Sequence, residues 1–239
     1  MSRPHVLLAS LSHEALAVPI DSPQPSFASA HTRGLATRLE GQSDGLFDSF
    51  RQAGDLAWRV LMCSPLAAAR GAGGPSRFGY RLQTSGMEAL VDQWSSADLA
   101  FFITALLDRL ALACNATGQP ISPLAATGQL FDAPQASAIA GDSTPLAVRA
   151  IGGIEHKLRA ALTTLVPIDQ ARILIPKDNL PELSPEHRIW VERGVIVPVQ
   201  QIQDVLDALK TLPVLPDAMR EVLCDLHAPF EGNPYRGIE

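Results

Sequence analysis

Residues 150–179 read AIGGIEHKLRAALTTLVPIDQARILIPKDN, and this stretch decides the fold that we expect. The pair Gly152 and Gly153 interrupts the chain, and residues 154–164 after it are predicted to form a helix. The short apolar run at 172–175 then predicts a strand that ends at Pro176. A helix followed closely by a short strand is typical of a domain in which helices pack on a sheet.

The rest of the chain predicts a similar succession of elements. We expect strands within residues 5–20 and at 78–82, 123–131, 146–151 and 195–199, and helices at 45–62, about 97–113, 202–209 and 217–226. The small polar residues 134–144 predict a hairpin loop. Because hairpins occur beside alternating strands and helices, we expect an α+β, or mixed α/β, fold. We place one domain at residues 1–212, with its core at about 75–210, and a C-terminal tail at 213–239 that holds a short helix and is partly disordered.

Composition and charge exclude several classes of protein. The chain has 239 residues, 46% of them hydrophobic, and a formal net charge of -6, which argues against a nucleic-acid partner. Its cysteines, Cys63, Cys114 and Cys224, are too widely spaced for a disulfide framework or a zinc site. The longest apolar stretch, residues 97–107, is too short to cross a membrane, and the first residues lack a signal peptide's apolar core. We therefore expect a cytoplasmic protein without a membrane or nucleic-acid partner.

A phosphate-binding loop is also missing from the sequence. The glycine-rich residues 71–74 are followed by Pro75 and Ser76, where a P-loop would have a lysine and a Ser or Thr. We therefore expect no ATPase in this chain, and we expect neither a cofactor nor a metal.

Three side chains could carry nucleophilic chemistry. A serine attacks a carbonyl only if a base removes its proton, and Ser96 precedes an apolar run whose helix would begin with free backbone N–H groups. Lys157 lies among apolar neighbours on its predicted helix, so partial desolvation would leave its amine partly neutral. Thr127, within the strand predicted at 123–131, could orient either group through its hydroxyl.

These residues occur within motifs that follow one another in a known order. The motifs are Ser96-Ala97-Asp98-Leu99-Ala100, Thr127-Gly128-Gln129-Leu130, Gly152-Gly153 with Lys157, and Ile175-Pro176 with Asn179. In this order they resemble the proteolytic domain of Lon proteases, and residues 195–209 are similar to that domain's closing strand and helix. The resemblance implies a fold of the Lon proteolytic domain type, in the ribosomal protein S5 domain 2-like class.

The resemblance also implies an activity and an assembly. Ser96 would be the nucleophile and would form an acyl-enzyme, Lys157 would be its base, and Thr127 would orient them. The chain would be a serine endopeptidase that cleaves polypeptides, with a separate AAA+ ATPase as partner. Lon-type domains form hexameric rings, so a homo-oligomer, a hexamer by resemblance, is implied.

Several alternatives stay open on the sequence alone. Ser95 is a rival nucleophile, Ser96 could be an ordinary helix cap, and Lys157 could be a solvated surface lysine. Asp98 replaces the glycine of the Lon pattern, and its motif is similar to the Lon-like domain of the recombination protein RadA. That similarity implies a catalytically inactive interaction or assembly module as the alternative function, and a carboxylate facing Lys157 would raise the pKa of the amine. A small-molecule kinase of the same broad fold is a weaker alternative, because no glycine-rich phosphate loop is present.

The histidines add no further candidate. Glu155 and His156 flank the lysine and are expected on the exposed surface of its helix, since nothing completes a set of metal ligands. The other histidines, including His187, are too scattered along the sequence to suggest a site.

Overall fold

The computed structural model describes residues 4–9, 15–21, 44–71, 81–82, 94–130 and 147–226. The strands are β1 (Pro4–Ala9), β2 (Ala15–Asp21), β3 (Arg81–Leu82), β4 (Leu124–Ala126), β5 (Arg172–Pro176) and β6 (Ile196–Val199). The α-helices are α1 (Asp44–Met62), α2 (Pro65–Ala69), α3 (Asp98–Ala113), α4 (Ile154–Thr164), α5 (Pro185–Glu192), α6 (Ile202–Lys210) and α7 (Asp217–Asp225). Short 3-10 turns are η2 (Trp94–Ala97), η3 (Ile168–Gln170) and η4 (Lys177–Glu182).

The strands form one mixed sheet in the order β3-β2-β1-β4-β5-β6. β1, β4, β5 and β6 run parallel, whereas β2 pairs antiparallel with β1 and β3 antiparallel with β2. In the parallel part, His5, Ala125, Ile173 and Ile196 are successive partners across the sheet. The parallel strands and their crossover helices, combined with the antiparallel hairpin, confirm the expected α+β or mixed α/β class.

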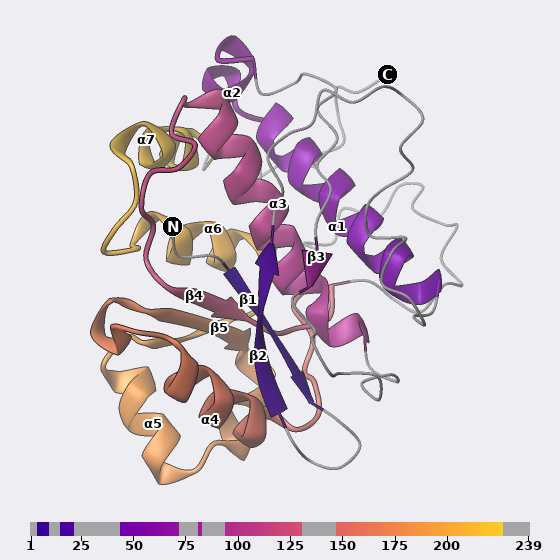
Figure 1. The fold of residues 1–239 in the computed structure, drawn as a ribbon, viewed down its shortest axis with the longest axis vertical. Helices are drawn as coiled ribbons and strands as arrows, with labels where there is room; N and C mark the ends of the chain where they lie inside the picture. The colour runs from indigo at the N-terminus through magenta and orange to yellow at the C-terminus, as the bar shows by residue number, and fades with distance from the viewer. Residues whose placement is uncertain are drawn as a thin grey trace.

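Alternate strand residues face two separate hydrophobic cores. Leu124 and Ala126 of β4 face the larger core, and Ala125 between them faces the smaller one. The larger core contains buried side chains of α1, α3, α6 and α7, and the smaller one contains those of α4. Helices therefore cover both faces of the sheet, with α4 and α5 lying together below β4 and β5 in Figure 1, away from α1, α2 and α7.

α3 lies in the larger core and is buried on nearly all sides, as its almost continuous apolar sequence predicts. Asp98 in its first turn is favourably placed relative to the helix dipole. Asn115 follows the helix with a left-handed backbone, at φ 52°, which ends it where the sequence indicated.

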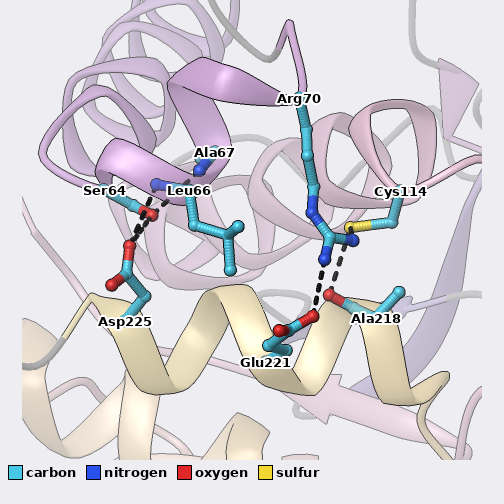
Figure 2. A network of polar contacts seen from close by, with 8 residues as sticks. All are labelled: Ser64, Leu66, Ala67, Arg70, Cys114, Ala218, Glu221 and Asp225. Atoms are coloured by element: carbon cyan, nitrogen blue, oxygen red, sulfur yellow. Dashed lines mark hydrogen bonds and ion pairs between the residues drawn. The ribbon is translucent and has the colours of Figure 1, made fainter.

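α7 is the helix expected in the C-terminal tail, and it packs into the larger core through its buried apolar face. Figure 2 shows how polar contacts also join it to α2. The Asp225 carboxylate accepts hydrogen bonds from the Ser64 hydroxyl and, at 3.1 Å, from the Leu66 N–H. One turn earlier in α7, the Glu221 carboxylate forms an ion pair with the Arg70 guanidinium at 2.5 Å. The segment through Leu226 is thus an integral layer of the structure, and residues 227–239 lie outside the described part.

Two expected strands are shorter than the sequence suggested. The strand expected at 123–131 is limited to Leu124–Ala126, because beyond Thr127 the backbone turns to bond with the start of α3. The strand expected at 146–151 forms only single bridges, Gln129 with Arg149 and Ala147 with Gln201, because it lies between two different partners. The hairpin loop expected at 134–144 lies outside the described residues.

The helices at 45–62, 97–113, 154–164 and 202–209 are confirmed within one or two residues. Within the described ranges, no helix combines the length and apolar character needed to span a bilayer.

Candidate active site

Thr127 lies directly after β4 and is the centre of the candidate site. Its side chain is fully buried, and its hydroxyl donates to the backbone carbonyl of Ser96 at 3.0 Å. The Lys157 amine donates to the same hydroxyl at 3.5 Å. Since α3 packs in the larger core and α4 in the smaller one, Thr127 connects residues that come from opposite faces of the sheet.

Lys157 reaches Thr127 because of how α4 begins. Gly153 caps the helix with a left-handed backbone, at φ 69°, which glycine adopts without strain. Ile154, Leu158 and Ala161 then pack against the sheet, and Lys157 on the same side of the helix is only 1% exposed. Burial lowers the pKa of Lys157 from its ordinary value of 10.5 to about 8. The expected desolvation of this lysine is therefore present, and the alternative of a solvated surface lysine is wrong.

Ser96 lies in η2, immediately before α3, and is buried. Its carbonyl accepts a second hydrogen bond, from Gly128 N–H at 2.9 Å, and Gly128 in turn accepts from Leu99 N–H at 3.1 Å. The backbone around the serine is thus fixed to the segment after β4. The Leu99 N–H is engaged in that contact, so it is not one of the free backbone N–H groups that we expected at the start of this helix.

Gly128 permits this close approach. A Cβ atom at this position would lie 2.8 Å from Cγ1 of Val148 and 3.3 Å from Cδ2 of Leu99. The first of these contacts is too short for real side chains and the second is unusually tight, so a larger residue would displace its neighbours and glycine is favoured at this position.

Asp98 is buried, and its carboxylate accepts a hydrogen bond from the Leu130 N–H at 3.0 Å. The side chain therefore stabilises the backbone two residues after Gly128. A carboxylate acting on Lys157 would raise the pKa of the amine, whereas the pKa is lowered by burial.

Asn179 is fully buried and binds the residue just before the glycine pair. Its amide oxygen accepts from Ile151 N–H at 3.0 Å, and its amide nitrogen donates to Ile151 C=O at 2.9 Å and to Glu182 at 2.9 Å. The side chain thus imitates a paired strand and fixes the chain that leads into α4.

Sequence reasoning missed a contact between α4 and α5. Glu155 accepts from Ser184 N–H at 2.6 Å and lies 2.7 Å from Nδ1 of His187. His156 is exposed, as expected, but Glu155 is partly buried, so the expectation of an exposed surface is wrong for Glu155. Partial burial opposes ionisation of Glu155, but the hydrogen bonds from Ser184 and His187 outweigh it and lower its pKa.

Glu155, His187 and Ser184 do not form a catalytic triad. The Ser184 hydroxyl lies 3.2 Å from Nδ1 of His187, which is the same ring nitrogen that contacts Glu155. A triad needs the acid and the nucleophile on opposite ring nitrogens. Ser184 also accepts from His187 N–H at the start of α5, so the cluster is a helix cap joined to α4. The Ser-Pro pair before His187 was the only sequence signal for this cap.

The Thr127 hydroxyl therefore contacts both the backbone carbonyl of Ser96 and the amine of Lys157, while Ser95 lies on the same turn η2 as Ser96. Within the described ranges, no three His, Cys, Asp or Glu side chains are grouped to bind a metal ion. A scan against protein-family models finds no family that matches this chain, and a search of curated proteins finds no match.

Proposed function

We propose that this chain is a Lon-like serine endopeptidase that cleaves polypeptides with Ser96 as nucleophile and Lys157 as base, on a fold similar to the Lon proteolytic domain in the ribosomal protein S5 domain 2-like class. One observation carries the proposal. A buried threonine hydroxyl bonds both the backbone of Ser96 and the amine of Lys157, although these residues come from elements on opposite faces of the sheet.

The lowered pKa of Lys157 supports its role as a base. With a pKa of about 8, roughly a tenth of the amine is neutral at pH 7, against less than about a thousandth for an ordinary lysine. The neutral amine takes the proton of the Ser96 hydroxyl as the oxygen attacks the peptide carbonyl. The resulting ammonium returns the proton to the leaving amine, and an ester remains on Ser96. Water, deprotonated by the same lysine, then hydrolyses the ester.

The partners belong to the same proposal. The substrate is a flexible or unfolded polypeptide, because the chain has no P-loop of its own to drive unfolding. A separate AAA+ ATPase would deliver folded substrates, and the working form would be a homo-oligomer, a hexamer by its resemblance to Lon, in the cytoplasm.

One observation favours a second candidate, the non-catalytic assembly module. Asp98 stands where the Lon pattern has a glycine, and its buried carboxylate is used to hold the Leu130 backbone. A buried carboxylate in place of the glycine of the Lon pattern gives this segment a structural role that the proposed catalysis does not require.

Labelling with a fluorophosphonate probe separates the two candidates. We expect the probe to attach to Ser96, with a rate that rises with pH and levels off above about pH 8, because only the neutral amine acts as base. Mass spectrometry of the labelled peptide distinguishes Ser96 from Ser95. The variants Ser96→Ala and Lys157→Met should lose labelling by about 100-fold or more, whereas Ser95→Ala should retain it. Absence of Ser96 labelling between pH 6 and 10 in the folded wild-type protein would reject the peptidase and favour the assembly module.

A further inference from the structure

We propose that Asn179 and Glu155 are positioning residues that hold Lys157 against Thr127. Asn179 bonds the segment before α4 to η4, and Glu155 bonds the first turn of α4 to the start of α5. We call these two sets of contacts the clamp. The effect of the clamp on catalysis rests on the proposed function, whereas its effect on the position of the Lys157 amine does not.

The covalent connection into α4 does not fix the direction of the helix. Gly152 and Gly153 precede its first residue, both are exposed, and glycine allows many backbone conformations. The apolar contacts of Ile154 and Leu158 hold α4 on the sheet, but apolar packing is not directional. Directional bonds are needed to set the rotation of the helix and so the position of the Lys157 amine.

Asn179 supplies the first set of directional bonds. It pairs with both backbone groups of Ile151, three residues before the helix begins, from inside the protein. The Gly153 carbonyl in turn accepts from the Lys157 N–H at 3.2 Å, so the lysine's own backbone bonds to the turn that Asn179 fixes.

Glu155 supplies the second set, two residues before Lys157. Its two carboxylate oxygens bind Ser184 N–H and the ring of His187 at 2.6 and 2.7 Å. These partners start α5, so the first turn of α4 is bonded to α5, while the segment that leads into α4 is bonded to η4 through Asn179. The amine of Lys157 is already at the outer limit of a hydrogen bond, 3.5 Å from Thr127, so a small rotation of α4 would break the contact.

The test measures the titration of Lys157 directly. The chain contains only the lysines Lys157, Lys177 and Lys210, so ¹³C-lysine labelling gives few NMR signals, and Lys157→Met assigns the one that matters. We expect Glu155→Ala and Asn179→Ala to raise the pKa of Lys157 by about 0.5 or more, because a loosened helix lets water reach the amine. Labelling of Ser96 at pH 7.5 should then fall by at least about 3-fold.

Controls separate positioning from general loss of stability. Glu186→Ala removes an exposed carboxylate from the first turn of α5 and should leave the Lys157 titration unchanged. Glu155→Gln keeps oxygen and nitrogen groups that can bond Ser184 and His187, so it should restore most of the wild-type titration. If Asn179→Ala does not fold, Glu155→Ala carries the test alone.

The outcomes are distinct from those of the proposed function. An unchanged Lys157 titration in folded Glu155→Ala would overturn the clamp, even if Ser96 is labelled normally. A wild-type protein without Ser96 labelling would overturn the peptidase, whereas a raised Lys157 pKa in Glu155→Ala would still establish the clamp.

Discussion

At the scale of the single residue, Lys157 is a side chain that is costly to bury. Its side chain is 1% exposed and lies on the sheet-facing side of α4, where the Thr127 hydroxyl accepts a hydrogen bond from its amine. Removing a charge from water without a counter-ion is unfavourable, and the amine responds with a lowered pKa. A protein that needed only a packed core would do better with an apolar side chain at this position, and the role as a base that we propose would account for the lysine.

This cost predicts that Lys157→Met is more stable than the wild type at pH 7, by on the order of 2 kcal/mol, measured by urea unfolding. The sign follows from the pKa values. The folded-state pKa of about 8 lies below the ordinary value of 10.5, so between these values the unfolded chain binds a proton that the folded chain does not. Wild-type stability therefore rises from pH 8 to 10.5, and the advantage of the methionine shrinks over the same window. If the free energies of unfolding of the two proteins changed with pH in the same way, the Lys157 amine would be solvated in the folded state and the prediction would be wrong.

At the scale of elements, the contact between α2 and α7 contains two kinds of interaction, a partly buried polar network and a surface ion pair. Ser64 is fully buried, and with the Leu66 N–H it depends on the Asp225 carboxylate, as Figure 2 shows. Arg70 and Glu221 form an ion pair in which the glutamate side chain is 61% exposed. Water screens the second interaction more than the first, because Ser64 is fully buried and Asp225 is half-buried.

We therefore expect Asp225→Ala to lower the free energy of unfolding by about 2 kcal/mol and Glu221→Ala by less than about 1 kcal/mol. Denaturant titration of both variants tests the ranking, and Glu221→Ala is the matched control from the same helix. Equal losses would mean that the Ser64 hydroxyl and Leu66 N–H find water when the carboxylate is removed.

The same elements show what the sequence could and could not predict. α4 and α6 were predicted with nearly correct ends, because a helix is encoded by local periodicity and by glycines beside it. The extent of β4 was wrong, because a strand ends where its partners end, and those lie far away in the chain. The contact of Glu155 with His187 joins residues 32 positions apart, and no local pattern of either helix indicates it.

At the scale of the whole molecule, the candidate site was predictable only through the order of its motifs. Composition and periodicity indicated a desolvated Lys157 but gave no reason for it to meet Ser96. Their shared contact with the Thr127 hydroxyl depends on the parallel placement of β1, β4 and β5, which brings the start of α3 and the inner face of α4 to the same end of β4. Sheet order is a property of long-range pairing, so a single sequence read locally does not determine it.

Sheet order and core packing together also decide where the domain ends. A chain cut after residue 212, the boundary expected from the sequence, would lose side chains that fill the larger core, namely Leu215, Met219, Val222, Leu223 and Leu226. At roughly 2 kcal/mol for each buried side chain, the loss approaches the whole stability of a typical domain, about 5–15 kcal/mol. We expect the 1–212 chain to show no cooperative unfolding by circular dichroism. In the full chain, Leu223→Ala should cost about 2–5 kcal/mol and the exposed neighbour Cys224→Ala close to nothing. Cooperative unfolding of the 1–212 chain at the wild-type urea midpoint would show that α7 is an appendage, and would return the domain boundary to residue 212.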